Sequence, residues 1–138
     1  MARAQGSTQI SPMLAVRDGI EAIEFYKAAF GAEERWRIDG GGHIVAGMSI
    51  DGAEFFLASA NPPGTNSPEA AGTTTVRIEL FVDDPVAVYE RAVAAGATAA
   101  ERPIERNHPT VDAKGVHMIQ GTVRDPSGHT WLIGKFLD

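Results

Sequence analysis

Two charged residues, Arg77 and Glu79, stand two positions apart in a stretch that alternates with apolar residues and ends at Val82. Successive side chains of a strand point to opposite faces, so this spacing places both charges on one face. An arginine fork can receive an anionic or carbonyl group of a small ligand, and a neighbouring glutamate can orient that ligand or act as a base. The alternative is a solvated ion pair at the open end of a sheet, and the residues leave both possibilities open.

A second set of reactive side chains, His108, Asp112 and His117, lies within ten residues of sequence. Imidazole and carboxylate groups are ligands that divalent transition metals use. Such trios also occur by chance in polar loops, so we expect no metal there, although the residue types alone do not decide the matter. The chain has no cysteine, which excludes disulfides and thiolate chemistry.

Other polar residues that resemble catalytic groups have simpler explanations. Asp83 and Asp84 precede a predicted helix, where a carboxylate is expected to cap the first turn. His129 follows a turn and is expected to bond the backbone of its hairpin. Trp131 stands in the middle of a predicted strand and is expected in the core.

The elements that must position these side chains occur twice in the chain. A strand, an aspartate and a helix recur at a constant offset of 66 residues, as between Asp18 and Asp84. Each copy then runs to a Gly-Ala pair, at Gly31 and at Gly96. The matching positions are Leu14, Val16, Asp18, Ile20 and Glu24 with Leu80, Val82, Asp84, Val86 and Glu90. This repeat indicates a duplicated module.

The duplication predicts a single domain of two β-α-β-β-β modules, residues 8–59 and 74–137, separated by a linker at 60–73. Apolar periodicity predicts a helix over 20–30 and strands over 10–16, 33–38, 43–50 and 53–59 in the first module. In the second module it predicts a helix from 85 to the stop at 96, strands over 76–82, 98–104, 116–124 and 129–136, and a polar loop over 105–115.

Composition limits the class of partner. The 138 residues are 43% hydrophobic and 22% charged with a net charge of −6, as in an ordinary soluble domain and unlike a nucleic-acid binder with its basic patch. No apolar run approaches the roughly 20 residues of a membrane span. Residues 1–9 are polar and lack the apolar segment of a secretory signal. We therefore expect a cytoplasmic protein with no nucleic-acid or membrane partner.

Three stretches carry a resemblance to a known family: residues 20–32, 91–97 and the sequence Asp-Pro-Ser-Gly-His-Thr-Trp at 125–131. In order and spacing they resemble the vicinal oxygen chelate superfamily, also called the glyoxalase/bleomycin-resistance/dioxygenase fold, and most closely its PhnB-like branch. The resemblance covers nearly the whole chain. It implies an α+β fold in which two tandem modules form a curved mixed sheet around an open cavity, usually in a homodimer.

The resemblance also identifies where a metal would be held. In metal-dependent members four side chains that point into the cavity, usually His or Glu, bind the ion. The matching positions here are Ser11, Phe56 (or Leu57, if the register slips), Arg77 and Leu132. Arginine has no acceptor lone pair, and phenylalanine and leucine have no donor atom. The sequence therefore argues against a metal and against the metal-dependent activities of the family.

We expect a metal-free protein that binds a small molecule in a cavity near a dimer interface, similar to the bleomycin-resistance type, with no cofactor and no assigned catalytic residue. The candidate ligand-binding residues are Ser11, Met13, Trp36, Phe56, Arg77, Glu79, Thr130 and Leu132. The alternatives are a divergent enzyme of the same fold (a lyase, isomerase or dioxygenase acting on a small carbonyl or aromatic substrate) and a regulatory module without chemistry.

Overall fold

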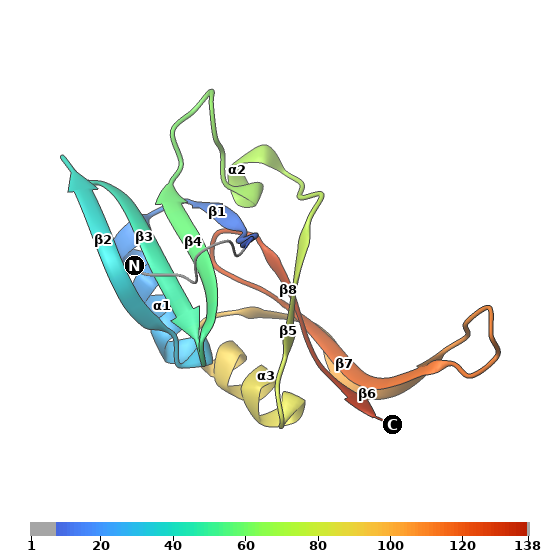
Figure 1. Cartoon of the computed structure of the whole chain (residues 1–138). Coiled ribbons are helices and arrows are strands. Elements are labelled where there is room, and N and C mark those ends of the chain that lie inside the picture. Colours follow the sequence, from blue (N-terminus) through green and yellow to red (C-terminus); the bar gives the residue numbers. More distant parts are fainter. Residues whose placement is uncertain (1–7, 138) are drawn as a thin grey trace.

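The computed structural model describes residues 8–137, which form two four-stranded sheets, each with one long helix (Figure 1). The first module contains β1 (Met13–Val16), α1 (Gly19–Phe30), β2 (Glu33–Gly40), β3 (His43–Ile50) and β4 (Ala53–Ser59). The second contains β5 (Arg77–Phe81), α3 (Pro85–Ala94), β6 (Thr98–His108), β7 (Val116–Arg124) and β8 (Thr130–Leu137). The predicted α+β architecture of two β-α-β-β-β modules is confirmed.

The two sheets have the same topology, with strand orders β1-β4-β3-β2 and β5-β8-β7-β6. The first strand of each module pairs in parallel with the last strand, with Met13 opposite Phe56 and Arg77 opposite Thr130. The remaining pairs are antiparallel. A parallel pair needs a crossover connection, and the helix of each module supplies it. The first and last strands therefore lie side by side in both modules.

The repeated aspartates begin both long helices. A carboxylate oxygen of Asp18 accepts a hydrogen bond from the backbone N–H of Glu21 at 3.0 Å, and Asp84 accepts one from Ala87 at 3.1 Å. Each satisfies a backbone donor that the first helical turn leaves without a partner. The prediction that Asp84 is a capping residue is thus confirmed.

Three segments differ from the sequence prediction. The prediction of a loop over 105–115 was wrong for residues 105–108, because β6 continues to His108. Glu105 to His108 pair with β7, as the earlier residues of β6 do. Pairing across a hairpin overrides the polar composition of that segment. The linker contains a one-turn helix, α2 (Pro68–Ala71), which Ser67 caps. The first strand begins at Met13, three residues later than predicted.

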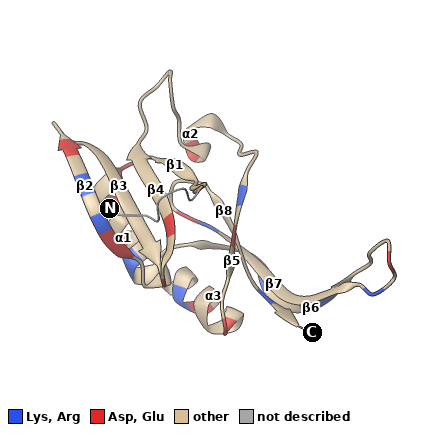
Figure 2. Cartoon of the chain, viewed as in Figure 1, with Lys and Arg blue, Asp and Glu red and all other residues tan. Residues whose placement is uncertain are grey.

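Residues 1–7, where the sequence predicts no signal segment, lie outside the described residues. Within residues 8–137 no helix is both long and apolar enough to cross a bilayer. Charged residues gather on β2 and also occur on α3 (Figure 2), whereas β3 has no Lys, Arg, Asp or Glu. The charges of the first sheet thus concentrate at its outer edge strand.

The core lies between the sheets and the two long helices. Tyr26 of α1 packs against Phe55 of β4, and both Tyr26 and Phe30 pack against Trp131 of β8. Trp131 is only 1% exposed, so its predicted place in the core is confirmed. The helices also touch directly, because the Arg91 guanidinium donates to the carbonyl of Ala28 at 2.7 Å. One aromatic cluster therefore spans both modules.

A buried carboxylate, that of Asp125, joins the two modules. One of its oxygens accepts from the Tyr26 hydroxyl at 2.5 Å and from the Trp131 indole N–H at 3.0 Å. The other accepts from the backbone N–H groups of Ser127 and His129, both at 3.0 Å. Asp125 is 4% exposed, so its charge depends on these four donors. The carboxylate holds its own hairpin and the helix of the other module at once.

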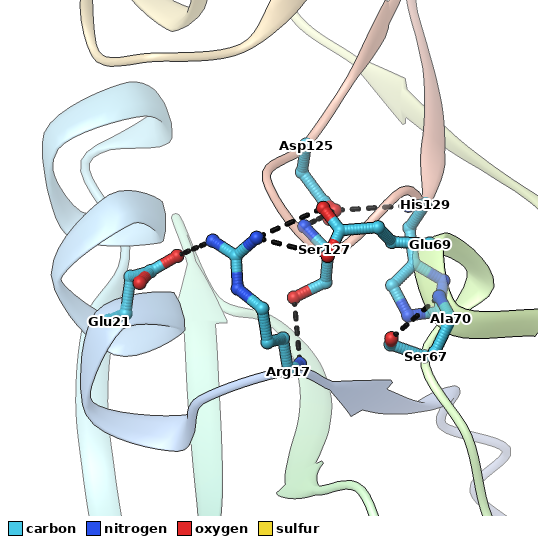
Figure 3. Close-up of polar contacts among 8 residues, drawn as sticks. All are labelled: Arg17, Glu21, Ser67, Glu69, Ala70, Asp125, Ser127 and His129. Atoms are coloured by element: carbon cyan, nitrogen blue, oxygen red, sulfur yellow. Dashed lines mark hydrogen bonds and ion pairs between the residues drawn. The ribbon is translucent and has the colours of Figure 1, made fainter.

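A second group of contacts joins the linker to the same hairpin (Figure 3). The backbone N–H of Arg17 donates to the Ser127 hydroxyl at 3.0 Å, and the backbone N–H of Glu69 donates to the Ser127 carbonyl at 2.9 Å. The Arg17 guanidinium pairs with Glu69 at 2.9 Å and with Glu21 of α1. The short helix α2 is therefore docked on the hairpin that joins β7 and β8.

His129 has the predicted structural role but a different partner. Its ring nitrogen Nε2 lies 2.7 Å from the backbone oxygen of Ala15, in β1 of the other module, and donates to it. The prediction that the His129 side chain bonds the backbone of its own hairpin was wrong. The ring instead bonds the end of β1, which passes beside that hairpin. His129 thus contributes to the joint between the modules.

We expect the substitution Tyr26→Phe to lower the free energy of unfolding by about 1.5–3 kcal/mol, the range for a hydrogen bond to a charged group. The loss arises because one of the four donors to the buried Asp125 carboxylate disappears. Urea denaturation followed by circular dichroism measures it. The matched control is Tyr89→Phe, since the Tyr89 side chain is only partly buried and its hydroxyl makes no hydrogen bond within residues 8–137. That control should change stability by less than about 0.5 kcal/mol.

The same variant has a signature at high pH. Burial, and then the Asp125 charge, raise the pKa of the Tyr26 hydroxyl well above its ordinary value of 10.0. Above pH ~10 the unfolded chain loses this proton while the folded protein keeps it, so stability falls by up to ~1.4 kcal/mol per pH unit. Tyr26→Phe should remove this part of the slope. Equal slopes in the two proteins above pH ~10 would contradict the role given to the buried hydroxyl.

Candidate functional site

Each sheet has one face packed on the helices and a second face, which we call the open face. In β5, Ile78 and Leu80 pack against the core, as does Val82 directly after the strand, whereas Arg77, Glu79 and Phe81 are exposed. The predicted division of this strand is therefore what the structure has. The candidate site lies on the open faces, because strand alternation places most of the predicted residues there.

An aromatic pair occupies the open face of the first sheet. The rings of Trp36 and Phe56 lie with centroids 5.6 Å apart and planes inclined by 45°. Between them in the sheet stands Gly47, which pairs with both residues. Met13 pairs with Phe56 and is 55% exposed. We call Met13, Trp36, Gly47 and Phe56 the aromatic shelf.

Gly47 makes the shelf possible. A Cβ atom at this position would overlap Nε1 and Cε2 of Trp36, so the indole can lie against the sheet only over a glycine. The importance of this residue was missed at the sequence level. The signal was present, because a glycine inside an apolar strand often marks the close approach of another group.

The charged pair of the second sheet forms an ion pair. Nε of Arg77 donates to a Glu79 carboxylate oxygen at 2.7 Å, and both side chains are almost half exposed. The structure thus contains the ion pair of the second possibility, and ligand binding by Arg77 stays a prediction. A pair this exposed contributes about 0–1 kcal/mol to stability. A guanidinium has five N–H donors, so this contact leaves part of Arg77 available.

The other predicted site residues are less accessible to a ligand. Thr130 is half-buried beside Arg77 in the sheet. Leu132 pairs with Glu79, lies against Gly134 and is 2% exposed, so in the single chain it offers no surface to a ligand. Ser11 precedes β1 and accepts a hydrogen bond from Gln9 at 2.8 Å.

The predicted residues thus come together in two groups. Met13, Trp36 and Phe56 meet on the first sheet, and the residues from β5 and β8 meet on the second. Within residues 8–137 no hydrogen bond or ion pair joins one group to the other. Met13 also borders a cleft of about 420 Å³ between β1 and β5, with the linker as another wall. That volume is in the range of small-molecule pockets.

The four family metal positions do not fit a metal. Ser11 offers one hydroxyl, Arg77 brings a positive charge, and Phe56 and Leu132 have no donor atom. A divalent ion needs several oxygen or nitrogen ligands that converge on it. The pairing also separates them, since Phe56 belongs to the first group and Leu132 is buried in the second.

His108, Asp112 and His117 do not converge either. His117 pairs with Asn107 across the β6–β7 hairpin, so His108 points to the opposite face. Nε2 of His108 lies 2.6 Å from the Gln120 amide oxygen. The Thr110 hydroxyl donates to Asp112 and lowers the pKa of that carboxyl. In the part of the chain that is described, no three His, Asp or Glu side chains are arranged to hold a metal ion.

Two tandem β-α-β-β-β modules, joined through their helices and leaving two open sheet faces, define the class of this protein by its fold. The chain belongs to the Glyoxalase/Bleomycin resistance protein/Dioxygenase superfamily, whose family model matches residues 8–133. It is also 35% identical over 132 residues to an uncharacterized protein of Mycobacterium bovis, a match that covers 91% of this chain and 82% of the relative.

Solved structures show the same fold. TioX from Micromonospora sp. ML1 is similar with a TM-score of 0.67 and 23% identity, covering 95% of this chain and 98% of TioX. A glyoxylase/bleomycin resistance protein/dioxygenase domain from Frankia sp. EAN1pec has a TM-score of 0.70 and 17% identity, covering 95% and 98%. A gene product from Arabidopsis thaliana has a TM-score of 0.67 and 27% identity, covering 94% and 99%. The superfamily includes both enzymes and binding proteins, so this likeness defines the fold and leaves the function to the site.

We expect Gly47→Ala to displace the Trp36 indole from the shelf, because the new methyl group would occupy its place. In protein labelled with fluorotryptophan, the fluorine NMR spectrum has one signal for each of the two tryptophans. The Trp36 signal should move and the buried Trp131 signal should stay. Gly40→Ala is the matched control, since a Cβ there would meet no atom within 4 Å. A Trp36 signal that is the same in all three proteins would contradict the close packing of the shelf.

Proposed function

We propose that this protein binds a small molecule with a flat aromatic part, without a resident metal, in a cavity near a homodimer interface. The observation that carries the proposal is the aromatic shelf, which places a half-buried indole, a half-buried phenyl ring and an exposed thioether together on the open face of a sheet. Such residues usually pack inside a protein or bind a ligand. The ring pair is available to stack on a planar group.

The residue types at the family's metal positions support binding without a metal. A site with one hydroxyl, two hydrocarbon side chains and a guanidinium would repel a cation rather than hold it. Within the superfamily, the motifs at 20–32, 91–97 and 125–131 favour the PhnB-like branch. The proposed protein sequesters its ligand, in the manner expected of the bleomycin-resistance type, and carries no assigned catalytic group.

Exposed apolar residues on the second sheet support the homodimer. Phe81 and Phe136 stack with ring centroids 4.6 Å apart on the open face, and they are 44% and 57% exposed. On the first sheet, Ile38 is 60% exposed. Apolar side chains gathered on the open faces are typical of a surface that another molecule covers. A second copy of the chain, with its own open faces, is the partner we propose.

Binding should be measured with metal removed. We expect a thermal-shift screen of planar aromatic and glycopeptide compounds in EDTA to find a ligand that stabilises the protein. Trp36→Ala should lower the affinity for that ligand, measured by calorimetry, about tenfold or more. The reason is that a stacked aromatic pair contributes about 1 kcal/mol beyond its buried area. Trp36→Phe, which keeps a ring, is the matched control and should lose less.

Two results would argue against the proposal. One is stoichiometric nickel, zinc, iron or manganese in the purified protein, which would favour the divergent enzyme. The other is a screen in which every compound leaves the melting temperature unchanged.

The dimer is tested by sedimentation velocity. We expect the wild-type protein to sediment as a dimer and Phe136→Glu to shift it toward the monomer, because a carboxylate would enter an apolar contact. Ile20→Glu is the matched control: Ile20 is 45% exposed on α1, away from the open faces, and its substitution should leave the dimer intact. A monomeric wild-type protein at high concentration would overturn this part of the proposal.

A further inference from the structure

A row of polar side chains crosses the second sheet at the end nearest the linker. The pairing places Thr98 opposite Arg124, Arg124 opposite Thr130, and Thr130 opposite Arg77. Paired residues share a face, and the neighbouring row of Val123 and Trp131 is buried in the core. The polar row therefore lies on the open face, with adjacent members about 5 Å apart.

A hollow of about 630 Å³ opens over the Arg124 end of this row. The sheet contributes Thr98, Arg124 and Thr130 to its wall, and Thr73 at the end of the linker and the following Thr74 add to it. The threonines and one guanidinium thus line the same hollow, and of the four hydroxyls only that of Thr74 already donates within the described residues, to the carbonyl of Val76 at 3.2 Å. Hydroxyl and guanidinium N–H groups are all donors, so the hollow is equipped to receive a group that only accepts hydrogen bonds.

The acidic residues at the hollow do not neutralise Arg124. Glu69 is paired with Arg17 at 2.9 Å, and the Asp125 carboxylate is buried and accepts four hydrogen bonds on the side of the core. Arg77, at the far end of the row, is paired with Glu79. Within residues 8–137 Arg124 forms no ion pair, so it is the charged group of the hollow that lacks a counter-charge.

From this geometry we infer that the hollow is a second binding site, for the carboxylate group of a small organic acid. A guanidinium receives a carboxylate through two parallel hydrogen bonds, and the threonine hydroxyls supply further donors. A single unpaired positive charge in the hollow, in a chain of net charge −6, matches a singly charged group and disfavours polyanions. The volume leaves room for the remainder of a small molecule. The site is separate from the aromatic shelf and does not depend on it.

The test uses benzoate as the probe and the full-length protein labelled with nitrogen-15. We expect benzoate to cause saturable shifts in the amide signals of Thr73, Thr74, Thr98 and Thr130 and in the Arg124 side-chain signal. Benzamide, the neutral analogue of the same shape, should cause none. Arg124→Gln should lower the affinity for benzoate about tenfold or more, since a hydrogen-bonded charge is lost. Arg102→Gln is the matched control, because it removes an exposed positive charge from the same strand as Thr98, outside the hollow.

Several outcomes would overturn the site: no saturable shifts with benzoate, equal shifts with benzamide, an unchanged affinity in Arg124→Gln, or tight binding of inorganic phosphate in place of benzoate. If Arg124→Gln fails to fold, Arg124→Lys retains the charge without the planar fork and should bind benzoate more weakly than the wild type. Trp36→Ala should bind benzoate as the wild type does. That result would show that benzoate binds apart from the aromatic shelf. If the proposed ligand of the shelf is not found, the benzoate shifts should still be observed.

Discussion

The Asp125 carboxylate is the contact on which the arrangement of the two modules depends. It sits in the interior, where a charge without donors would cost several kcal/mol, and its four donors come from three places: its own turn, the Trp131 indole and the Tyr26 hydroxyl of the other module. The turn, the aromatic cluster and α1 must therefore be in place together. Arg17, Glu69 and His129 add contacts around the same hairpin, and so the linker and β1 are held there too (Figure 3).

This joint also explains why the open faces are exposed. Both long helices pack on one side, where they share a core with both sheets, and α1 and α3 touch through Arg91. Two helices cannot cover both faces of two sheets, so the opposite faces keep apolar side chains such as Met13, Phe81 and Phe136 in contact with solvent. An uncovered sheet face of this kind is suited to bind a ligand or a second copy of the chain. The interior contact that joins the modules thus determines which surfaces are available.

The two modules share a framework and differ in what they present. Both begin their helix at an aspartate cap, and both pair the first strand with the last. On the first sheet the open face carries an aromatic pair over a glycine, and β3 is free of charged residues. On the second sheet it carries arginines and threonines in one row. The two open faces of the duplicated fold thus differ, one with an aromatic pair and the other with arginines and threonines beside the exposed Phe81 and Phe136. The positions at which the family resemblance would place a metal do not offer a set of oxygen or nitrogen ligands.

The sequence by itself determined the features that depend on near neighbours and on residue chemistry. The cap at Asp84, the helical and strand periodicity and the exposed face of β5 all follow from a few adjacent residues. The family resemblance points to the metal positions, and the chemistry of their side chains makes them unsuitable for a metal. The tertiary structure alone decided which distant groups meet. Tyr26 and Asp125 are 99 residues apart, Trp36 lies over Gly47 because of the pairing of two strands, and β6 extends to His108 because β7 is there to pair with it. Register and packing are set by contacts across the whole chain, and no local pattern contains them.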